Sequence, residues 1–543
     1  MPVMATDRPP DRIPVFVPFT GLLMSLLPIL LIAAVWLRTP GDRAFMGELQ
    51  IDQFYYAANA RAMLRDGFHL SHANPYDPHA DAPRIYSHLF PLLVAAAARL
   101  TGCEPLHTYY FLRPILGILL ALSLWYFLSA LFSDRACLKL CFLLVVTAGG
   151  FSALLSAASA AGTVLRAPGA DFIASFGAAF VRSEEFIGEW LCSIARVFLF
   201  TPEILYHTIW FYTLGSYLRG NSMAVLGGIA LELYAHPFTG PELALVVALL
   251  CVTDLILGVN RRARAVTLVL VCALTAAFAG YIHFLNGDPC HRIIQATWRR
   301  FQAILPIDRY AHLYGAWLIL GLAGLATSLR DFRTSAGARC LWTQGVVIFL
   351  LSHHQWLVPE AVQPAHFSRG YLFVVLVSLS VDFIRRFRPT WPAAICSRRG
   401  LLAVSLLALS IDHPSYFVFC AVRAQDPPMT LQKEEARLLD RLGDLKTREF
   451  VASDGNVGPL IPVFTDHRTL LGHWPLTPGY DRAESLLNLW VQSGRPDLLR
   501  EYPDISILFL PRHAAEPVGR DPAFARDWAL LDETPNFVLY RRQ

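Results

Sequence analysis

The chain has 543 residues, of which 55% are hydrophobic and only 16% are charged, with a mean hydropathy of +0.42. Soluble globular chains carry roughly 25% charged residues, so this composition excludes an ordinary soluble protein. The formal net charge of +4 does not indicate nucleic-acid binding, because a few arginines at a membrane surface account for it.

Apolar runs of bilayer-spanning length recur along the chain, and each crossing needs about 20 residues. The first run contains Leu22 to Leu37. It lacks a small-residue cleavage site and precedes many similar runs, which indicates a membrane anchor rather than a signal peptide. The sequence therefore predicts an all-α polytopic membrane bundle of about 11 transmembrane helices, near residues 17–37, 113–132, 137–158, 203–218, 222–235, 242–258, 265–284, 312–329, 341–357, 368–384 and 401–420.

Short basic connectors predict the orientation of this bundle. The positive-inside rule places four of them in the cytoplasm: Asp134–Lys139, Asn260–Arg264, Arg330–Arg339 and Arg385–Arg399. The N-terminus is then also cytoplasmic. The segments expected outside are 38–112, 159–202, 236–241, 285–311, 358–367 and the residues after Cys420. The polar residues of chemical interest fall on this outer side.

The chain changes character near residue 424 and predicts a C-terminal soluble α/β domain at 424–543, outside the membrane. Its expected helices are 429–445 and 481–494, and its expected strands are 449–453, 505–511 and 536–542. The membrane domain then covers 1–423 and includes the long outer loop 38–112. The C-terminal domain contains no nucleotide-binding glycine loop, which argues against a soluble nucleotide donor.

The ten cysteines show no metal-type C-x-x-C spacing. Most lie inside apolar runs, where a free cysteine behaves as a small buried hydrophobe. Cys103 and Cys290 lie in expected outer loops, and the sequence leaves open whether they pair.

Two acids and two tyrosines follow the first span closely. Within Gly47–Leu64, Glu48 and Asp52 are four residues apart, and Tyr55 and Tyr56 come next. The apolar spacing predicts a helix along the membrane surface with Asp52 near its N-terminus. Residues i and i+4 share a helix face, so the acids fit a salt-bridge scaffold, a metal clamp or an active-site base. Asp52 as a capping residue is the structural alternative.

Polar side chains also interrupt two later apolar runs. Tyr86 and His88 precede a proline that opens an apolar helix, which places them at the mouth of the bundle. His88 as a plain interfacial histidine is the alternative. His236 and Glu242 break a pair of spans, and a charge at the bilayer centre costs roughly 2.5–3.5 kcal/mol. Glu242 therefore needs a cavity or a partner, unless the break is only a hairpin turn.

Gln363, His366 and Arg369 precede or open the span near 368–384. An anionic lipid-linked substrate requires a fixed guanidinium, which binds phosphate through a rigid fork of donors. The structural alternative is that Arg369 extends to the headgroups without binding a substrate.

These features together resemble the GT-C superfamily, the integral-membrane glycosyltransferases that use polyprenyl-phosphate sugars. The family includes protein mannosyltransferases and aminoarabinose transferases. The resemblance lies in Glu48–Tyr56, in Tyr86–Pro91 and in Thr465–Tyr480, which looks like the outer domain of bacterial members. The pair Ser87-His88 departs from the aminoarabinose-transferase pattern, where Glu-Lys is expected. No oligosaccharyltransferase-like WWD signature is present.

The resemblance implies a GT-C-like fold and an inverting transfer of a hexosyl or pentosyl unit from a polyprenyl-phosphate donor. The acceptor hydroxyl would belong to a lipid, glycan or protein on the outer face of the plasma (inner) membrane. It implies that Asp52 is the general base, and that Glu48 orients the acceptor or helps to bind a divalent cation, the one cofactor that the acids suggest. Donor-phosphate or substrate binding is implied for Arg369, His366, Gln363, Tyr55, Tyr86, His88, His236 and Glu242.

Two other functions fit parts of the pattern. Broken helices and intramembrane acids are typical of a secondary transporter, although transporters often show internal repeats and this chain shows no matching halves. A polysaccharide polymerase or ligase of the cell envelope is the second alternative, although its polar loop is expected later in the chain.

Overall fold

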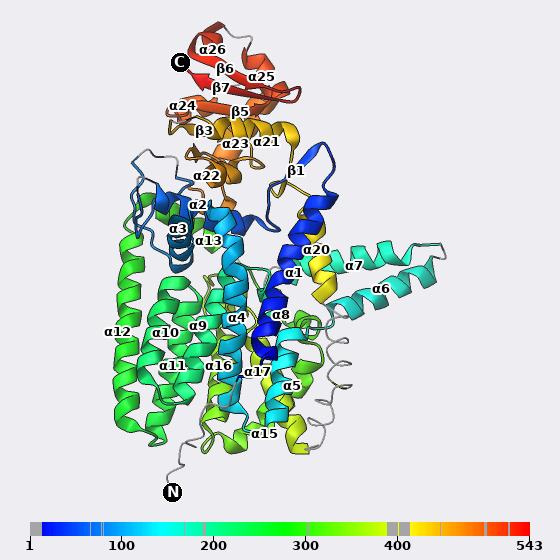
Figure 1. The fold of residues 1–543 in the computed structure, drawn as a ribbon, viewed down its shortest axis with the longest axis vertical. Helices are drawn as coiled ribbons and strands as arrows, with labels where there is room; N and C mark the ends of the chain where they lie inside the picture. The colour runs from blue at the N-terminus through cyan, green and yellow to red at the C-terminus, as the bar shows by residue number, and fades with distance from the viewer. Residues whose placement is uncertain are drawn as a thin grey trace. The chain divides into compact units, whose positions relative to one another are not determined.

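The computed structural model describes residues 13–543 except 66, 78, 80, 168, 188–191, 301–302, 388–399, 401–412, 446, 494–496 and 520–521. The chain divides into two compact units. Unit 1 comprises Met1–Pro28, Leu112–Gly280 and Phe301–Phe419. Unit 2 comprises Ile29–Phe111, Tyr281–Arg300 and Cys420–Gln543. Figure 1 shows that unit 1 is helical and that the sheet belongs to the C-terminal part of unit 2.

Unit 1 is built from apolar helices. Those that lie wholly within it are α5 (Arg135–Thr147), α6 (Ser152–Arg166), α7 (Phe172–Ile187), α8 (Ile194–Val197), α9 (Thr201–Leu218), α10 (Ser222–Ala235), α11 (Thr239–Ile256), α14 (Tyr310–Tyr314), α15 (Ala316–Ser328), α16 (Ala336–Ser352) and α17 (Tyr371–Phe387). Four more helices run from one unit into the other: α1 (Phe16–Arg38), α4 (Pro105–Leu131), α12 (Arg261–Leu285) and α20 (His413–Arg423). Short 3-10 turns join some of them: η2 (Ile307–Arg309), η3 (Leu329–Asp331), η4 (His354–Trp356) and η5 (Pro364–Phe367).

Polar residues in the connectors begin several of these helices. The Asp134 carboxylate accepts hydrogen bonds from the first backbone N–H groups of α5, and Asn221 and Ser335 cap α10 and α16 in the same way. Close packing between α15 and α17 depends on glycine, since a Cβ at Gly321 or Gly324 would overlap the backbone of α17. The sequence therefore specifies both where helices begin and where two of them pack tightly.

Four described helices are long and apolar enough to cross a membrane, namely α1, α4, α11 and α12. Two bent pairs raise the number to six among the described residues: α5 with α6, bent by 53°, and Ile307–Tyr314 with Ala316–Asp331, bent by 102°. These helices do not confirm the predicted number of about 11 spans. Helices α9, α10, α16 and α17 form at predicted positions but are shorter or less apolar. Part of the expected span 401–420 lies outside the described residues.

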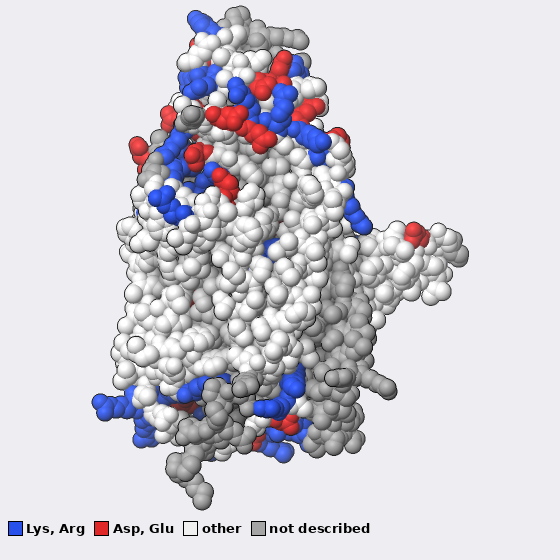
Figure 2. All heavy atoms as spheres, in the orientation of Figure 1, with Lys and Arg blue, Asp and Glu red and all other residues white. Residues whose placement is uncertain are grey.

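The surface of unit 1 has the features expected of a membrane protein. Figure 2 shows a broad band with almost no Lys, Arg, Asp or Glu, with Lys and Arg gathered at the lower end of the view. Large hydrophobic side chains remain exposed along the spans, among them Ile115, Leu119, Val266, Val269 and Ile319. Such a surface is what lipid-facing helices require, and it would promote aggregation in water.

Unit 2 contains a five-stranded sheet of order β4-β3-β5-β7-β6. Strand β3 (Phe450–Ser453) is parallel to β4 (Arg468–Thr469) and β5 (Ile507–Pro511), and β7 (Phe537–Arg542) is antiparallel to β5 and β6 (Trp528–Glu533). The three predicted strands are confirmed, and the two predicted helices appear as α21 (Lys433–Gly443) and α23 (Tyr480–Ser493). The sheet region also contains α22 (Ile461–Phe464), α24 (Asp497–Glu501), α25 (Arg512–Gly519), α26 (Pro522–Asp527) and the turns η6 (Gly458–Leu460) and η7 (Trp474–Leu476). Strands β4 and β6 were not predicted, because β4 has only two residues and β6 has one fully buried residue among its six.

The segment between α1 and α4 belongs to the same unit as this sheet. It contributes β1 (Arg43–Phe45), α2 (Ile51–Leu64) and α3 (Leu89–Thr101), and the segment after α12 contributes α13 (Pro289–Arg300). Strand β1 pairs antiparallel with β2 (Thr430–Gln432), which precedes α21. The boundary predicted at residue 424 remains a prediction, since compact unit 2 also takes in residues 29–111 and 281–300.

Helix α2 packs into the hydrophobic core beneath the sheet. Phe54, Ala57 and Ala58 share one buried cluster with Leu438 and Val451. Burying a side chain such as Phe54 contributes about 1.5–3 kcal/mol, so this contact holds α2 firmly. The apolar face that predicted a helix along the membrane surface is therefore covered by protein.

Candidate active site

Asp52 lies in the first turn of α2, where the unpaired N–H groups of a helix N-terminus favour a negative charge. Gln50 occupies the N-cap position, so Asp52 is not the capping residue. The side chain of Asp52 is 54% exposed, whereas that of Glu48 is buried. An exposed carboxylate at this position can reach a substrate.

His473 orients this carboxylate. Its Nε2–H group donates to Asp52 Oδ1 across 2.6 Å, and its own side chain is only 7% exposed. The loop before η7 can approach closely because residue 472 is glycine, and a Cβ there would overlap the ring of Tyr76. Since the histidine is buried and the carboxylate is exposed, the acid is the member of the pair that can accept a proton from a bound hydroxyl.

Aromatic rings surround the pair. Tyr55 stacks on Tyr76 at 6.2 Å between ring centroids, and the ring of His473 lies 5.8 Å from that of Tyr55. Burial raises the pKa of the Tyr55 hydroxyl, and the nearby Asp52 charge adds to the increase. Burial raises the pKa of the Tyr76 hydroxyl in the same way. Both phenols therefore remain protonated at neutral pH and present an apolar wall with hydroxyl donors.

Glu48 lies just before α2 and is fully buried. The preceding Gly47 has a φ of +104°, a conformation that favours glycine, and its carbonyl accepts a hydrogen bond from the Tyr110 hydroxyl. Within the described part of the chain, neither Glu48 nor Asp52 belongs to a group of three potential metal ligands. The expected cation at these two acids remains a prediction.

Tyr86 and His88 lie in unit 2 beside other histidines. The backbone of Tyr86 pairs with that of His72, and its ring lies 5.8 Å from the His72 ring. Its hydroxyl is 3.3 Å from Nδ1 of His291. His88 occupies the N-cap position of α3, 6.2 Å from the ring of Tyr56. Burial raises the pKa of Tyr86 well above its usual range.

Two of these histidines, His72 and His88, should make the folded protein less stable at acid pH. Burial lowers the pKa of His72 from 6.5 to about 4, and burial together with His72 lowers the pKa of His88 to about 3. In this range the unfolded chain binds more protons than the folded chain, so stability falls as the pH drops below 6.5. His88→Asn should reduce this loss by about 1.4 kcal/mol per pH unit between about pH 4 and 5.5.

Thermal unfolding of the purified protein across this pH range measures the slope. The matched control is His107→Asn, because His107 is exposed in the first turn of α4 in the same unit and its replacement should leave the slope unchanged. Equal slopes for the wild type and His88→Asn would show that His88 is not buried in its neutral form.

Arg369 lies in unit 1 and forms an ion pair with Glu203 at the start of α9. The two side chains are 13% and 6% exposed. The backbone carbonyl of Arg369 accepts a hydrogen bond from Nε2 of His207 at 2.5 Å. The guanidinium is therefore held inside the protein, in contrast to an arginine that only extends to lipid headgroups.

His236 and His366 lie near each other in unit 1. Their ring centroids are 6.3 Å apart, and the ring of Phe238 stacks on His366 at 4.6 Å. The break between α10 and α11 occurs at the predicted position. Nδ1 of His236 accepts a hydrogen bond from the backbone N–H of Thr239 at 3.1 Å. Thr239 is the first residue of α11, so this histidine also helps to fix the start of that helix. The interpretation of this break as a hairpin turn therefore accounts for part of the role of His236.

Buried polar groups cluster around these histidines. Glu242 and Glu232 are 1% and 0% exposed, and Tyr371 interacts electrostatically with both and with Arg369. Gln363 is buried in a left-handed conformation with a φ of +46°. Within the described residues, the carboxylate oxygens of the two glutamates and the Gln363 amide have no hydrogen-bond partner. Such groups are costly in an apolar interior, which marks this region as a candidate ligand site.

Several of these residues were not singled out by sequence reasoning. The histidine that contacts Asp52 lies 421 residues further along the chain, within the segment Thr465–Tyr480 that carried the family resemblance. Glu203 and Glu232 each lie inside an apolar run, and an isolated acid in such a run could have marked them as candidate site residues.

The sequence left open whether Cys103 and Cys290 pair, and the structure has both as free thiols.

No family model and no curated protein matches this chain. Among solved structures, it is similar to the archaeal oligosaccharyltransferase AglB from Archaeoglobus fulgidus in complex with an inhibitory peptide and a dolichol-phosphate, at 13% identity and a TM-score of 0.44, covering 98% of this chain and 75% of that one. The apo form of the Archaeoglobus fulgidus oligosaccharyltransferase is similar at 14% identity and a TM-score of 0.45, covering 96% and 74%. At this level of similarity these structures carry no function over to this chain.

Proposed function

We propose that this chain is a GT-C-type membrane glycosyltransferase that moves a sugar from a polyprenyl-phosphate donor to an acceptor hydroxyl. The observation that carries the proposal is the pair formed by Asp52 and His473. An exposed carboxylate at a helix N-terminus is oriented by a buried histidine across 2.6 Å. The half-buried ring of Tyr55 and the buried ring of Tyr76 lie beside this pair. This arrangement supports a general base for a hydroxyl nucleophile.

In the proposed reaction the acceptor oxygen forms a bond to the anomeric carbon while the bond from that carbon to the phosphate oxygen breaks. The acceptor proton passes to the Asp52 carboxylate. A single displacement of this kind inverts the configuration at the anomeric carbon. Glu48 takes a positioning role in this proposal, because its side chain is fully buried. Tyr55, Tyr86 and His88 are proposed to contact the sugar or the acceptor.

The leaving phosphate gains negative charge as this bond breaks, and fixed cationic donors would stabilise it. We assign this role to Arg369 in unit 1, with His366 and Gln363 as further donors and with His236 and Glu242 in the same polar region. A guanidinium carries five N–H donors, so an ion pair with Glu203 is compatible with a phosphate contact. The rigid fork of arginine matches phosphate oxygens better than a lysine would.

The proposed reaction takes place on the extracytoplasmic face of the plasma (inner) membrane. The basic connectors between spans favour this orientation, because they belong in the cytoplasm. The donor lipid would enter from the bilayer. The acceptor would be a lipid, a glycan or a protein that presents a hydroxyl group.

The buried acids of unit 1 favour one other candidate function. Glu232 and Glu242 are buried where α10 and α11 meet at a break, and such sites bind ions in secondary transporters. A polysaccharide polymerase or ligase remains a second alternative, and it would share the lipid-linked donor.

Native mass spectrometry of the purified protein distinguishes these functions. A glycosyltransferase of this type should retain a polyprenyl-phosphate sugar, whose mass identifies both the sugar and the length of the carrier. Addition of an acceptor hydroxyl compound should convert the bound species to polyprenyl phosphate. Retention of a small solute without any lipid-linked sugar would favour a transporter and contradict the proposal.

A further inference from the structure

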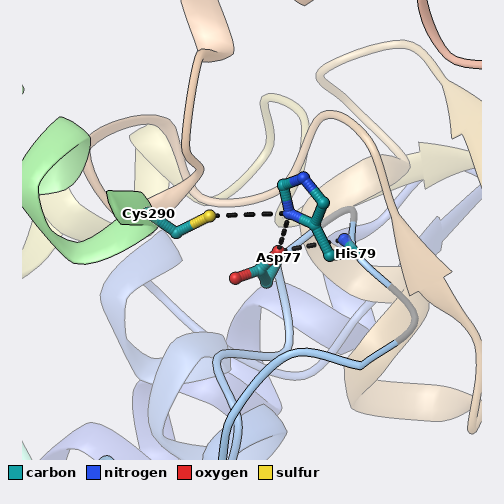
Figure 3. Close-up of side chains that lie close together, drawn as sticks. All are labelled: Asp77, His79 and Cys290. Atoms are coloured by element: carbon teal, nitrogen blue, oxygen red, sulfur yellow. Dashed lines mark hydrogen bonds and ion pairs between the residues drawn. The ribbon is translucent and has the colours of Figure 1, made fainter. Parts of the chain in front are cut away.

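Three metal-ligating side chains of unit 2 meet outside the Asp52–His473 pair. Nδ1 of His79 lies 2.8 Å from Oδ1 of Asp77 and 3.5 Å from Sγ of Cys290. The ligand atoms of Asp77, His79 and Cys290 all lie within 4.8 Å of one another. Figure 3 shows the three side chains pointing toward one another, two from the first outer loop and Cys290 from α13.

These separations are close to those of a tetrahedral zinc site. Zinc bonds of about 2.0 Å to oxygen, 2.05 Å to nitrogen and 2.3 Å to sulfur require N···S and N···O separations of about 3.5 Å and 3.3 Å. The observed Nδ1···Sγ distance of 3.5 Å already meets the first requirement. The Nδ1···Oδ1 distance of 2.8 Å must increase by roughly half an ångström for the second. A small side-chain rotation of exposed His79 provides that increase.

Backbone contacts hold the ligands in place before any ion binds. Asp77 is 3% exposed, and its carboxylate accepts the backbone N–H of His79 at 2.9 Å. Cys290 lies in the first turn of α13, where the Asp288 carboxylate accepts the backbone N–H of His291 at 2.8 Å. The loop and the helix therefore present the three ligands with little further ordering.

The local charge favours a cation. Asp77 and Asp288 lie within electrostatic range of Cys290, and Asp504 and Asp77 both lie within range of Arg468. Asp81 also lies within electrostatic range of Arg468, so three carboxylates face this one guanidinium. A divalent ion among the ligands would offset the remaining negative charge.

The cluster also opens onto a cavity of about 270 Å³. His79 and Cys290 form part of its wall, and Glu501, Tyr502 and Asp504 form another part. Three protein ligands leave one position of a tetrahedral ion vacant, as in zinc sites that exchange a bound water. The cavity provides room for that water.

We propose that Asp77, His79 and Cys290 bind one zinc-class divalent cation whose fourth ligand is a water in this cavity. The mixed oxygen, nitrogen and sulfur donors select zinc over magnesium or calcium, which prefer oxygen ligands alone. The ion would join the first outer loop to α13, two segments that are 211 residues apart along the chain at His79 and Cys290. The proposal does not depend on the reaction that the protein catalyses.

Cobalt titration of the full-length purified protein, after treatment with a chelator, tests the site. Co²⁺ should bind at one ion per chain and produce a thiolate-to-cobalt charge-transfer absorption, which Zn²⁺ should displace. Cys290→Ser should abolish this absorption and weaken Zn²⁺ binding by about 100-fold or more. The matched control is Cys103→Ser, because Cys103 is another free, partly exposed thiol of unit 2 and should leave both properties unchanged.

A second measurement uses only the wild-type chain and so does not depend on whether a variant folds. Zn²⁺ should slow the alkylation of Cys290, because a metal-bound thiolate is not free to react, and should leave the labelling of Cys103 unaltered. The proposal is overturned if Zn²⁺ protects neither thiol, or protects both equally. It is also overturned if Cys290→Ser binds cobalt with the wild-type affinity, since the cluster would then be held by hydrogen bonds only.

Discussion

Asp52→Asn should reduce glycosyl transfer by about 10²–10⁴-fold, the usual contribution of a positioned general base. Asparagine has nearly the same shape, and its amide oxygen can still accept the hydrogen bond from His473. It cannot accept the proton of an acceptor hydroxyl. Thermal stability should therefore stay near that of the wild type, because Asp52 is 54% exposed and does not cap α2.

Transfer from a polyprenyl-phosphate sugar, measured on the purified variant together with its melting temperature, tests this assignment. The matched control is Asp42→Asn, an exposed acid between α1 and α2 in the same unit, which should retain wild-type activity. His473→Gln should lower the rate less than Asp52→Asn, since it removes orientation but leaves the base. Wild-type turnover in Asp52→Asn would eliminate Asp52 as the base and would leave His473 with a structural role.

Arg369→Ala should destabilise the protein by about 3–5 kcal/mol, because it leaves the buried carboxylate of Glu203 without its counter-charge. The two side chains are only 13% and 6% exposed, so water cannot replace the lost partner. Arg369→Lys keeps the charge and should cost less, although it loses the planar fork. Denaturation of the purified variants measures these differences.

The double variant Glu203→Gln with Arg369→Gln separates stability from donor binding. It removes both charges of the pair, so most of the lost stability should return. If donor binding stays lost in this stable variant, Arg369 contacts the phosphate. Normal donor binding and turnover in the double variant would limit Arg369 to a structural ion pair. The donor-phosphate assignment would then move to His366 and His236.

Much of the helical and strand pattern follows from local sequence. Helix α10 occupies the predicted residues 222–235, and the predicted break near His236 separates it from α11. The short apolar runs of the C-terminal segment predicted β3, β5 and β7 to within two residues. These features depend on periodicity within one element, so neighbouring residues are enough to specify them.

Local pattern was less informative about what each apolar face contacts. The apolar residues of α2 predicted contact with the membrane surface, whereas Phe54 lies in the same buried protein core as Val451. The hydrophobic effect is non-directional, and an amphipathic helix satisfies it equally well against lipid or against a sheet. Only the tertiary structure distinguishes the two.

The sequence by itself determined that the chain is rich in long apolar helices, that an α/β segment follows them, and that Asp52 lies near the start of a helix. It could not determine that His473 contacts Asp52, that Glu203 pairs with Arg369, or that Cys290 joins Asp77 and His79. Helices and strands are specified by hydrogen bonds and side-chain spacing over a few residues, which any window of the chain contains. A polar side chain acts through partners within about 3 Å, and folding brings those partners from positions hundreds of residues away.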